Sequence, residues 1–461
     1  MQNNINHLRL HRIHFIAIGG AAMHNLAIAL KNKGFSISGS DDEIFEPSLS
    51  RLKKYDLLPR GWGWYPDRIS NNLDAIILGM HAKNNNPELI RAQELGIKIY
   101  SYPEFLYEQT KEKTRVVIAG SHGKTTITAM VIHVLKNCGV AFDFMVGSQI
   151  EGFETMVSLE SSNSIAVFEG DEYLSSSIDL RPKFLHYKPH IALISGIAWD
   201  HVNVFPSYEN YVKQFRMLID DILTNGHLVY YTDDKDLKDL ATTVKSPIHK
   251  HPYQEHKHQV IQEITYLKTK DNQSIKISLF GNHNLQNISG AAIICKLLGI
   301  HDSDFYSAIE SFAGTAKRLQ IVRKSKDNIV FLDFAHSPSK VRATVKAVKN
   351  QFIDRVLIAV LELHTYSSLN INFISNYEKT LNMADEAVVY YNLDVIKNKG
   401  LQIFNPGDVK LYFKNKKLIV FNKREQLSEY FENIAKRKAV ILLMSSGNFG
   451  GINLEKIFNE S

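Results

Sequence analysis

The chain has 461 residues, which is more than one hydrophobic core usually organises, so two or three domains are expected. Hydrophobic residues at 44% and charged residues at 22% exclude a disordered chain, and 54 basic against 48 acidic residues, interspersed, argue against nucleic-acid binding. No apolar run approaches the length of a membrane span, and the two cysteines lack metal-type spacing, so we expect a cytoplasmic protein with reduced thiols and no membrane insertion.

The first segment, residues 1–110, alternates short apolar runs with helix-like stretches. Ile13–Ile18 is predicted to be a strand, Met23–Lys33 a helix and Phe35–Gly39 a second strand. The same pattern predicts a strand at 75–78, a helix at 87–95 and a strand at 97–100. Strands that alternate with helices favour a parallel sheet with right-handed crossovers, so we expect a Rossmann-like domain.

A glycine turn joins the first predicted strand to the first helix. Gly19, Gly20 and Ala21 lie in a degraded dinucleotide-binding fingerprint, in which alanine takes the first and third glycine positions. Ser40 and Asp41 follow the next strand, where an acidic side chain can reach a ribose. We expect these five residues to bind a nucleotide. The alternative is a turn that only packs, with Asp41 as a turn aspartate.

The most specific motif lies between an apolar run at 116–119 and a helix-like stretch at 127–135. Its residues are Gly120, Ser121, His122, Gly123, Lys124, Thr125 and Thr126. A glycine loop in this context turns backbone N–H groups and the positive end of a helix toward a polyphosphate. We expect Lys124 to reach the terminal phosphates and Thr125 to contact a magnesium ion, so ATP is the predicted ligand. The alternative is a glycine turn with a surface lysine.

Acidic residues follow two further apolar strands of the second segment, residues 111–318. Ile165–Phe168 is followed by Glu169, and Ile191–Ile197 is followed by Asp200 and His201. Because the carboxyl ends of parallel strands border the ligand crevice, Glu169 is a candidate magnesium ligand. For His201 the chemistry leaves a base or hydrogen-bond donor as an alternative to a metal ligand, since magnesium prefers oxygen.

Later in this segment the pattern predicts a hairpin over Val260–Leu279, with its turn at 270–273. A helix follows, and its Asn284 and Asn287 lie three residues apart on one face. Their amides are candidates for contacts with the adenine or ribose of ATP. Helix capping is the alternative, because asparagine satisfies free N–H groups at helix starts.

The third segment, residues 319–461, returns to strand–helix alternation. Its predicted strands are 329–332, 356–360, 387–391, 418–421 and 440–444, and its predicted helices include 341–351 and 424–436. Arg318, at the segment boundary, is a candidate phosphate clamp, although a lone arginine is more often a surface residue. Asp333 ends a strand and is predicted to reach ATP. No flexible linker separates the segments, so we expect the domains to move by hinges.

Taken in order, these motifs resemble the Mur ligase family over nearly the whole chain. The matching features are the first glycine turn, the loop at 120–126, Glu169, Asp200–His201, His283–Asn287, Lys317–Arg318 and Asp333–His336. The resemblance implies a three-domain α/β protein with a Rossmann-like UDP-sugar domain at 1–110, a central P-loop ATPase-like domain at 111–318 and a Rossmann-like acceptor domain at 319–461. It also implies ATP and Mg²⁺ as cofactors, and catalytic roles for Lys124, Glu169 and His201, with a second magnesium ion between the last two.

Within the family, the segments Asp171–Tyr173 and Arg181–Tyr187 resemble the branch that joins the murein peptide L-Ala-γ-D-Glu-meso-diaminopimelate to UDP-N-acetylmuramate. The branch that adds L-alanine to the same sugar is the alternative. Ser337 and Glu362–Thr365 depart from the family pattern, and no equivalent of the lysine that some members carbamylate is assigned.

Two other protein classes are weighed against this resemblance. A non-catalytic UDP-sugar-binding regulator would have lost Lys124, Glu169 or His201, and all three are present. A P-loop motor or transporter ATPase would end the metal-binding strand in aspartate rather than Glu169. The oligomeric state is expected to be a monomer or a homodimer.

Overall fold

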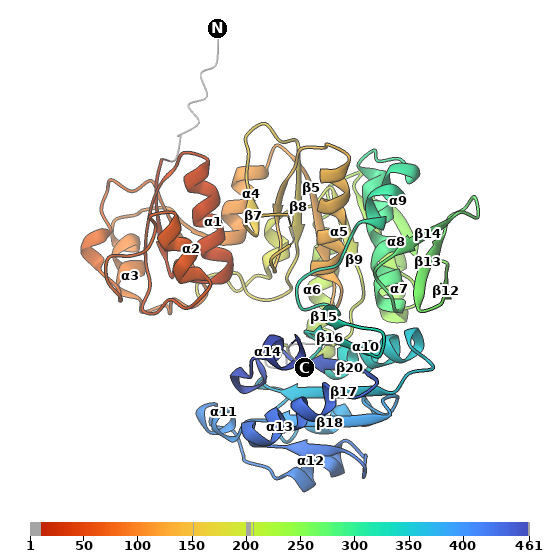
Figure 1. Cartoon of the computed structure of the whole chain (residues 1–461). Coiled ribbons are helices and arrows are strands. Elements are labelled where there is room, and N and C mark those ends of the chain that lie inside the picture. The colour runs from red at the N-terminus through yellow and green to blue at the C-terminus, as the bar shows by residue number, and fades with distance from the viewer. Residues whose placement is uncertain (1–10, 151, 200–203, 206, 460–461) are drawn as a thin grey trace. The chain divides into compact units, whose positions relative to one another are not determined.

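The structure is a computed structural model that describes residues 11–150, 152–199, 204–205 and 207–459 (Figure 1). The described chain forms two compact units. The first contains the residues up to Ala198 together with Tyr208–Tyr253 and Gly290–His301. The second consists mainly of Gln254–Ser289 and Asp302–Ser461. The chain therefore passes between the units more than once.

A four-stranded, wholly parallel sheet opens the first unit. In spatial order its strands are β2 (Ser36–Ser40), β1 (Arg12–Ile16), β3 (Ala75–Leu78) and β4 (Ile99–Ser101). Its helices are α1 (Ala21–Asn32), α2 (Ser48–Lys54), α3 (Pro87–Glu94) and α4 (Tyr102–Thr110). The predicted alternation is confirmed, and α2 and α4 are additions to it. The side chain of Ser101 starts α4 by accepting a hydrogen bond from the backbone N–H of Glu104.

A seven-stranded sheet forms the rest of the first unit, and only its edge strand β7 is antiparallel. The strand order is β11 (His249–Tyr253), β10 (His227–Tyr231), β9 (Ile191–Ile194), β5 (Thr114–Ala119), β8 (Ile165–Glu169), β6 (Asp143–Met145) and β7 (Val157–Ser158). The helical segments here are α5 (Lys124–Asn137), the 3-10 helix η2 (Lys183–His186), α6 (Tyr208–Asp220) and α7 (Lys235–Thr243). Because β5 lies between β8 and β9, the loop after β5 adjoins the acidic end of β8.

The second unit begins with an antiparallel sheet of three strands. These are β12 (His258–Ile261), β13 (Ile264–Lys268) and β14 (Ser274–Ile277). The next helices are α8 (Asn282–Leu297), whose residues from Gly290 onward belong to the first unit, and α9 (Asp302–Glu310). The predicted turn between β13 and β14 is confirmed, but the prediction of a single hairpin was wrong. Gln262 and Glu263 both adopt positive φ, at 49° and 62°, and form an additional tight turn that no glycine signals.

A six-stranded sheet carries the remainder of the second unit, and β15 is its antiparallel edge. The strand order is β15 (Gln320–Lys324), β16 (Asn328–Asp333), β20 (Ala439–Met444), β17 (Leu357–Leu363), β18 (Glu386–Tyr391) and β19 (Ile419–Phe421). The helices are α10 (Pro338–Gln351), α11 (Leu393–Asn398), α12 (Pro406–Tyr412), α13 (Arg424–Ile434) and α14 (Leu454–Asn459). Alternate residues of β17 enter separate hydrophobic cores on the two faces, which explains its continuous apolar sequence.

Helix α10 is tied to the three-stranded sheet by side-chain hydrogen bonds. Gln351 accepts a bond of 3.1 Å from Thr265 and donates one of 2.7 Å to the backbone oxygen of Glu263. Arg355 contacts both carboxylate oxygens of Glu263, at 2.7 and 3.0 Å. Together these bonds join α10 and the segment that follows it to the three-stranded sheet and to the turn between β12 and β13.

Two further predictions concern the whole chain. Among the helices that the structure describes, none combines the length and the apolar character needed to span a membrane. Cys138 and Cys295 form no disulfide among the described residues, and Cys295 is buried. The predicted α/β fold with parallel sheets in the first, central and last parts of the chain is confirmed.

Candidate active site

The glycine loop after β5 has the backbone that a phosphate-binding loop requires. Gly120 and Gly123 have φ angles of +123° and +81°, and Gly123 precedes the first residue of α5. A Cβ atom at Gly120 would lie 2.3 Å from the hydroxyl oxygen of Ser195, so only glycine fits there. The Ser121 hydroxyl is buried and has no hydrogen-bond partner among the described residues. The start of α5 thus offers unpaired donors suited to a phosphate.

Lys124 is the first residue of α5 and is largely buried, with 11% of its side chain exposed. Its Nζ donates to the backbone oxygen of Gly120 and to Glu172 Oε2, both at 2.9 Å. Burial alone would lower the pKa of Lys124, but Glu172 and Asp171 outweigh burial and raise it. The interpretation of Lys124 as a surface lysine is therefore wrong.

Glu169 ends β8 and lies directly against the loop. Its Oε1 accepts a 2.7 Å hydrogen bond from the Thr125 hydroxyl, and its Oε2 accepts one of 2.6 Å from the Gly147 backbone. Burial, with the nearby charge of Asp171, raises the pKa of Glu169. A hydroxyl and a buried carboxylate form an all-oxygen donor pair, which is the chemistry that Mg²⁺ prefers, so these residues fit a magnesium ion.

The other predicted residues of this region have different outcomes. Asp200 and His201 lie outside the described residues. The described residues contain no group of three histidine, cysteine or acidic side chains placed to hold a metal. His122 Nδ1 is 2.6 Å from the backbone oxygen of Ser121, and Thr126 is buried in the first turn of α5. The contact of His122 with Ser121 lies within the loop itself.

Glu172 is a site residue whose partner the sequence did not indicate. It is fully buried, and besides Lys124 it accepts a 3.3 Å hydrogen bond from the hydroxyl of Tyr211 in α6. The only signal in the sequence was its membership of the acidic run that begins at Glu169. The charge of Glu172 offsets that of Lys124 and holds the ammonium at the mouth of the loop.

In the first glycine turn, the side chain of Asp41 accepts hydrogen bonds from the backbone. Asp41 Oδ2 accepts a 2.7 Å hydrogen bond from the Gly19 backbone, and Oδ1 accepts one of 3.0 Å from Asp42. Burial raises the pKa of Asp41. Gly20 caps α1 and Ala21 begins it, while the Ser40 backbone oxygen accepts bonds from residues 17 and 18. The five predicted residues are thus brought together, with Asp41 ordering the turn.

The ATP-binding residues predicted for the second unit lie at or near the beginnings of α8 and α10. The Asn284 amide donates a 2.9 Å bond to the backbone oxygen of Phe280, and Asn284 and Asn287 are both buried. Asp333 Oδ2 accepts from Leu319 N and Oδ1 from Ala335 N, each at 2.8 Å. The guanidinium of Arg318 lies 5.1 Å from the centre of the Phe334 ring.

His283 connects these groups electrostatically. Burial lowers the pKa of His283, the charge of Asp333 opposes this shift and that of Arg318 adds to it. Asp333, Arg318 and the start of α8 therefore share one neighbourhood. Asp333 also has a structural role. Its hydrogen bond with Leu319 N fixes the backbone next to Arg318.

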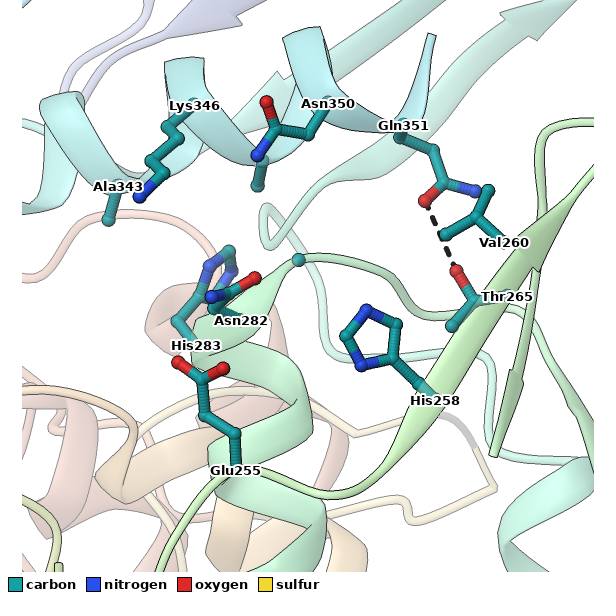
Figure 2. A pocket seen from close by; sticks show the side chains of 12 residues that line it. Glu255, His258, Val260, Thr265, Asn282, His283, Ala343, Lys346, Asn350 and Gln351 are labelled. Carbon is teal, nitrogen blue, oxygen red and sulfur yellow. Dashed lines mark hydrogen bonds between the residues drawn. The ribbon is translucent and has the colours of Figure 1, made fainter. Parts of the chain in front are cut away.

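A cavity of about 280 Å³ lies within the second unit beside this neighbourhood (Figure 2). Figure 2 shows Lys346 and Asn350 of α10 on one side, with Asn282 and His283 at the start of α8 and His258 of β12 facing them. The lining combines amide and imidazole groups with one acidic and one basic side chain, Glu255 and Lys346.

Three family models match the chain in sequence order. The model described as Mur ligase family, catalytic domain, matches residues 12–114; Mur ligase middle domain matches 118–295; and Mur ligase, glutamate ligase domain, matches 317–447. UDP-N-acetylmuramate–L-alanine ligase of Sulfurihydrogenibium sp. is 28% identical over 450 residues, covering 95% of this chain and 96% of that protein.

Two solved structures share the fold. UDP-N-acetylmuramate–alanine ligase from Thermotoga maritima aligns with a TM-score of 0.72 at 21% identity, over 97% of this chain and 98% of that one. A murein peptide ligase from Psychrobacter arcticus aligns with a TM-score of 0.65 at 22% identity, over 98% and 99% of the two chains. At these identities the likeness establishes the three-domain architecture.

Proposed function

The chain belongs to the Mur ligase family of ATP-dependent, amide-forming ligases of peptidoglycan synthesis, and on that premise we propose that it joins a murein peptide to UDP-N-acetylmuramate. One observation carries the catalytic part of this proposal. The loop lysine and the loop threonine, Lys124 and Thr125, each contact a buried carboxylate from the end of β8, at 2.9 and 2.7 Å. These contacts support the proposal that Lys124 supplies a cation, and Thr125 with Glu169 an all-oxygen metal site, at a helix start suited to a polyphosphate.

The chemistry explains why such a site is needed. A carboxylate is a poor electrophile, so the sugar carboxylate must first attack the γ-phosphorus of ATP and release ADP. The amine of the acceptor then attacks the carbonyl carbon of the acyl phosphate, loses a proton and expels phosphate. Because the carboxylate and the triphosphate are both anionic, the protein has to position them and neutralise their charge.

In the proposed mechanism, Lys124 contacts the β- and γ-phosphates and the 120–126 loop holds the chain of phosphates through its backbone. Thr125 and Glu169 would hold one magnesium ion, and Glu169 with His201 a second. When bound, magnesium supplies charge stabilisation to the transferring phosphoryl group. Thr125 can turn its hydroxyl proton away from Glu169, which frees oxygen lone pairs on both residues.

The remaining predicted residues complete the substrate sites in this proposal. Gly19, Gly20, Ala21, Ser40 and Asp41 bind the UDP part of the sugar substrate. Asn284, Asn287, Arg318 and Asp333 are proposed to contribute to ATP binding. We also propose domain boundaries near residues 110 and 318, with the acceptor bound by the last domain.

For the acceptor we propose L-Ala-γ-D-Glu-meso-diaminopimelate, because Asp171–Tyr173 and Arg181–Tyr187 resemble the branch that uses it. L-alanine is the second candidate, since the Sulfurihydrogenibium relative that matches 95% of this chain is an L-alanine ligase. The two differ only in the amine that attacks the same acyl phosphate.

An assay with purified protein tests the proposal. UDP-N-acetylmuramate, ATP and Mg²⁺ are incubated with the tripeptide, with L-alanine or with neither, and amide product and ADP are quantified. Amide product with the tripeptide supports the proposal. Amide product with L-alanine and none with the tripeptide shows instead that L-alanine is the acceptor. Hydroxylamine added in place of the acceptor should yield a hydroxamate; product formation without any trapped hydroxamate contradicts the acyl phosphate.

A further inference from the structure

A second buried lysine lies beside the catalytic carboxylates. Lys183, the first residue of η2, has an exposed side-chain fraction of 10%, and its Nζ is 3.2 Å from Asp171 Oδ2. The backbones of the two segments are also joined, because Lys183 N donates to Tyr173 O at 2.9 Å and Phe184 N donates to Asp171 O at 3.1 Å. The lysine is therefore held in place by main-chain contacts as well as by its charge.

The surroundings of this ammonium leave it short of acceptors. An ammonium has three N–H donors, and among the described residues Asp171 is its hydrogen-bond acceptor. The rings of Tyr173 and Tyr102 lie 4.9 and 5.3 Å from Nζ and offer only cation–π contacts. Burying a charged amine with donors unmatched is costly. An anionic ligand that replaces or joins Asp171 would remove this cost.

The position of Lys183 indicates which kind of ligand this would be. The charge of Asp171 acts on both Glu169 and Lys124, so the pair borders the phosphate-binding loop. Tyr102 begins α4, which follows the last strand of the four-stranded sheet, and α4 contacts η2. Lys183 therefore lies between the sheet that carries the Gly19 turn and the loop that carries Lys124.

We propose that Lys183 binds a carboxylate of a substrate, either that of the sugar acid or one on the acceptor, and that Asp171 holds the ammonium in place until the substrate arrives. This inference rests on the proposed function, in which a carboxylate crosses from the sugar-binding turn to the triphosphate. It adds a second cation to the site, which Lys124 alone cannot supply because Lys124 serves the phosphates.

Substitution of Lys183 by methionine tests the proposal, because methionine keeps an unbranched stem and removes the charge. KM is measured separately for ATP, UDP-N-acetylmuramate and the acceptor that the wild-type protein uses. Loss of one charge-assisted contact should raise KM for one carboxylate substrate about tenfold or more, with KM for ATP unchanged within about twofold. The substrate whose KM rises identifies the source of the carboxylate.

Two variants control for a merely structural effect. Lys183→Arg retains the charge and should keep KM within about threefold of wild type. Lys111→Met removes an exposed cation that belongs to none of the proposed binding sites and lies 3.5 Å from Glu108, and it should leave all three KM values unchanged. If Lys183→Met does not fold, Lys183→Gln carries the same comparison.

Three results would overturn the proposal: unchanged KM values for both carboxylate substrates, a common rise in all three, or an effect of Lys183→Arg as large as that of methionine. Failure of the proposed function is distinguishable, because the wild-type protein then forms no amide from UDP-N-acetylmuramate. If the wild-type protein forms the amide and the Lys183 variants have unchanged KM values, only the role proposed for Lys183 is contradicted.

Discussion

The two glycine turns of the first unit follow the same plan and use their carboxylates differently. Each joins a buried parallel strand to a helix, and each has an acidic residue from a neighbouring strand against it. At the loop after β5, Glu169 contacts the hydroxyl of Thr125. At the turn after β1, Asp41 contacts the backbone N–H of Gly19. A side-chain hydroxyl can exchange its partner for a metal, whereas a backbone N–H that is already bonded is part of the turn's own architecture.

The two turns also differ in charge. The first residue of α5 is Lys124, whereas the first residue of α1 is Ala21, so an anion at the turn after β1 would meet backbone N–H groups and the helix dipole in place of a lysine at this position. The comparison therefore predicts that single side-chain substitutions at the loop after β5 lower turnover strongly. Substitutions at the turn after β1 should change UDP-sugar binding much less.

The largest effect is expected for Lys124→Ala. Because it removes the cation on the transferring phosphoryl group, turnover should fall by about 10³-fold or more, while UDP-sugar affinity measured by calorimetry stays near wild type. Equal loss of both would show that the two turns are not separate sites.

The matched control for this variant is Lys124→Ala combined with Glu172→Gln. Alanine alone leaves the buried Glu172 carboxylate without its cation, which destabilises a protein by about 3–5 kcal/mol. The double variant should regain most of that stability, as measured by urea unfolding, and should remain inactive. A double variant that regains activity would mean that Lys124 acts only on folding.

Glu169→Gln tests whether Glu169 is a magnesium ligand at the loop after β5. Glutamine can still accept the Thr125 hydrogen bond but is a weaker magnesium ligand, so turnover should fall about 10²–10³-fold. The rise in melting temperature that MgATP gives the wild-type protein should shrink in the variant. A full MgATP-induced shift in Glu169→Gln would contradict the assignment of Glu169 as a ligand.

For the other turn, Asp41→Ala and Asp41→Asn form a pair. Alanine removes the acceptor for Gly19 N and should lower the free energy of unfolding by about 1–2 kcal/mol. Asparagine retains an acceptor and should stay within about 0.5 kcal/mol of wild type. Because Asp41 is proposed to bind the UDP part of the substrate, both variants should raise KM for the UDP-sugar about tenfold. Unchanged KM values would contradict that role and leave Asp41 only its structural role in the turn.

The smallest effect is a difference in pH dependence. Burial raises the pKa of Glu169 from its ordinary 4.5, so between 4.5 and the higher folded value the unfolded chain has released a proton that the folded protein keeps. The contribution of Glu169 to stability is therefore lost as pH rises through this window. Unfolding free energies of Glu169→Gln should fall less steeply than those of wild type above pH 4.5; parallel curves would contradict the shift.

The sequence predicted those parts of the molecule that local patterns specify. Continuous apolar runs marked the buried strands, and the glycines of the 120–126 loop marked a backbone with positive φ. The pairing of Lys124 with Glu172, and of Lys183 with Asp171, could not be predicted in this way. Both depend on how the chain after β8 folds back against β5, which is a long-range property. The turn at Gln262–Glu263 was missed because its residues carry no glycine or asparagine signal.

The contacts between Glu263 and Arg355 have a practical consequence for dissecting the protein. The three-stranded sheet precedes the last domain in the sequence, yet hydrogen bonds join the sheet and its Gln262–Glu263 turn to α10 and to Arg355, which follows α10. A truncation after residue 318 would therefore delete the hydrogen-bond partners of Thr265 and Glu263. Fragments for expression should therefore retain both the three-stranded sheet and the segment that contains α10 and Arg355. These two regions contact each other although they are separated in the sequence.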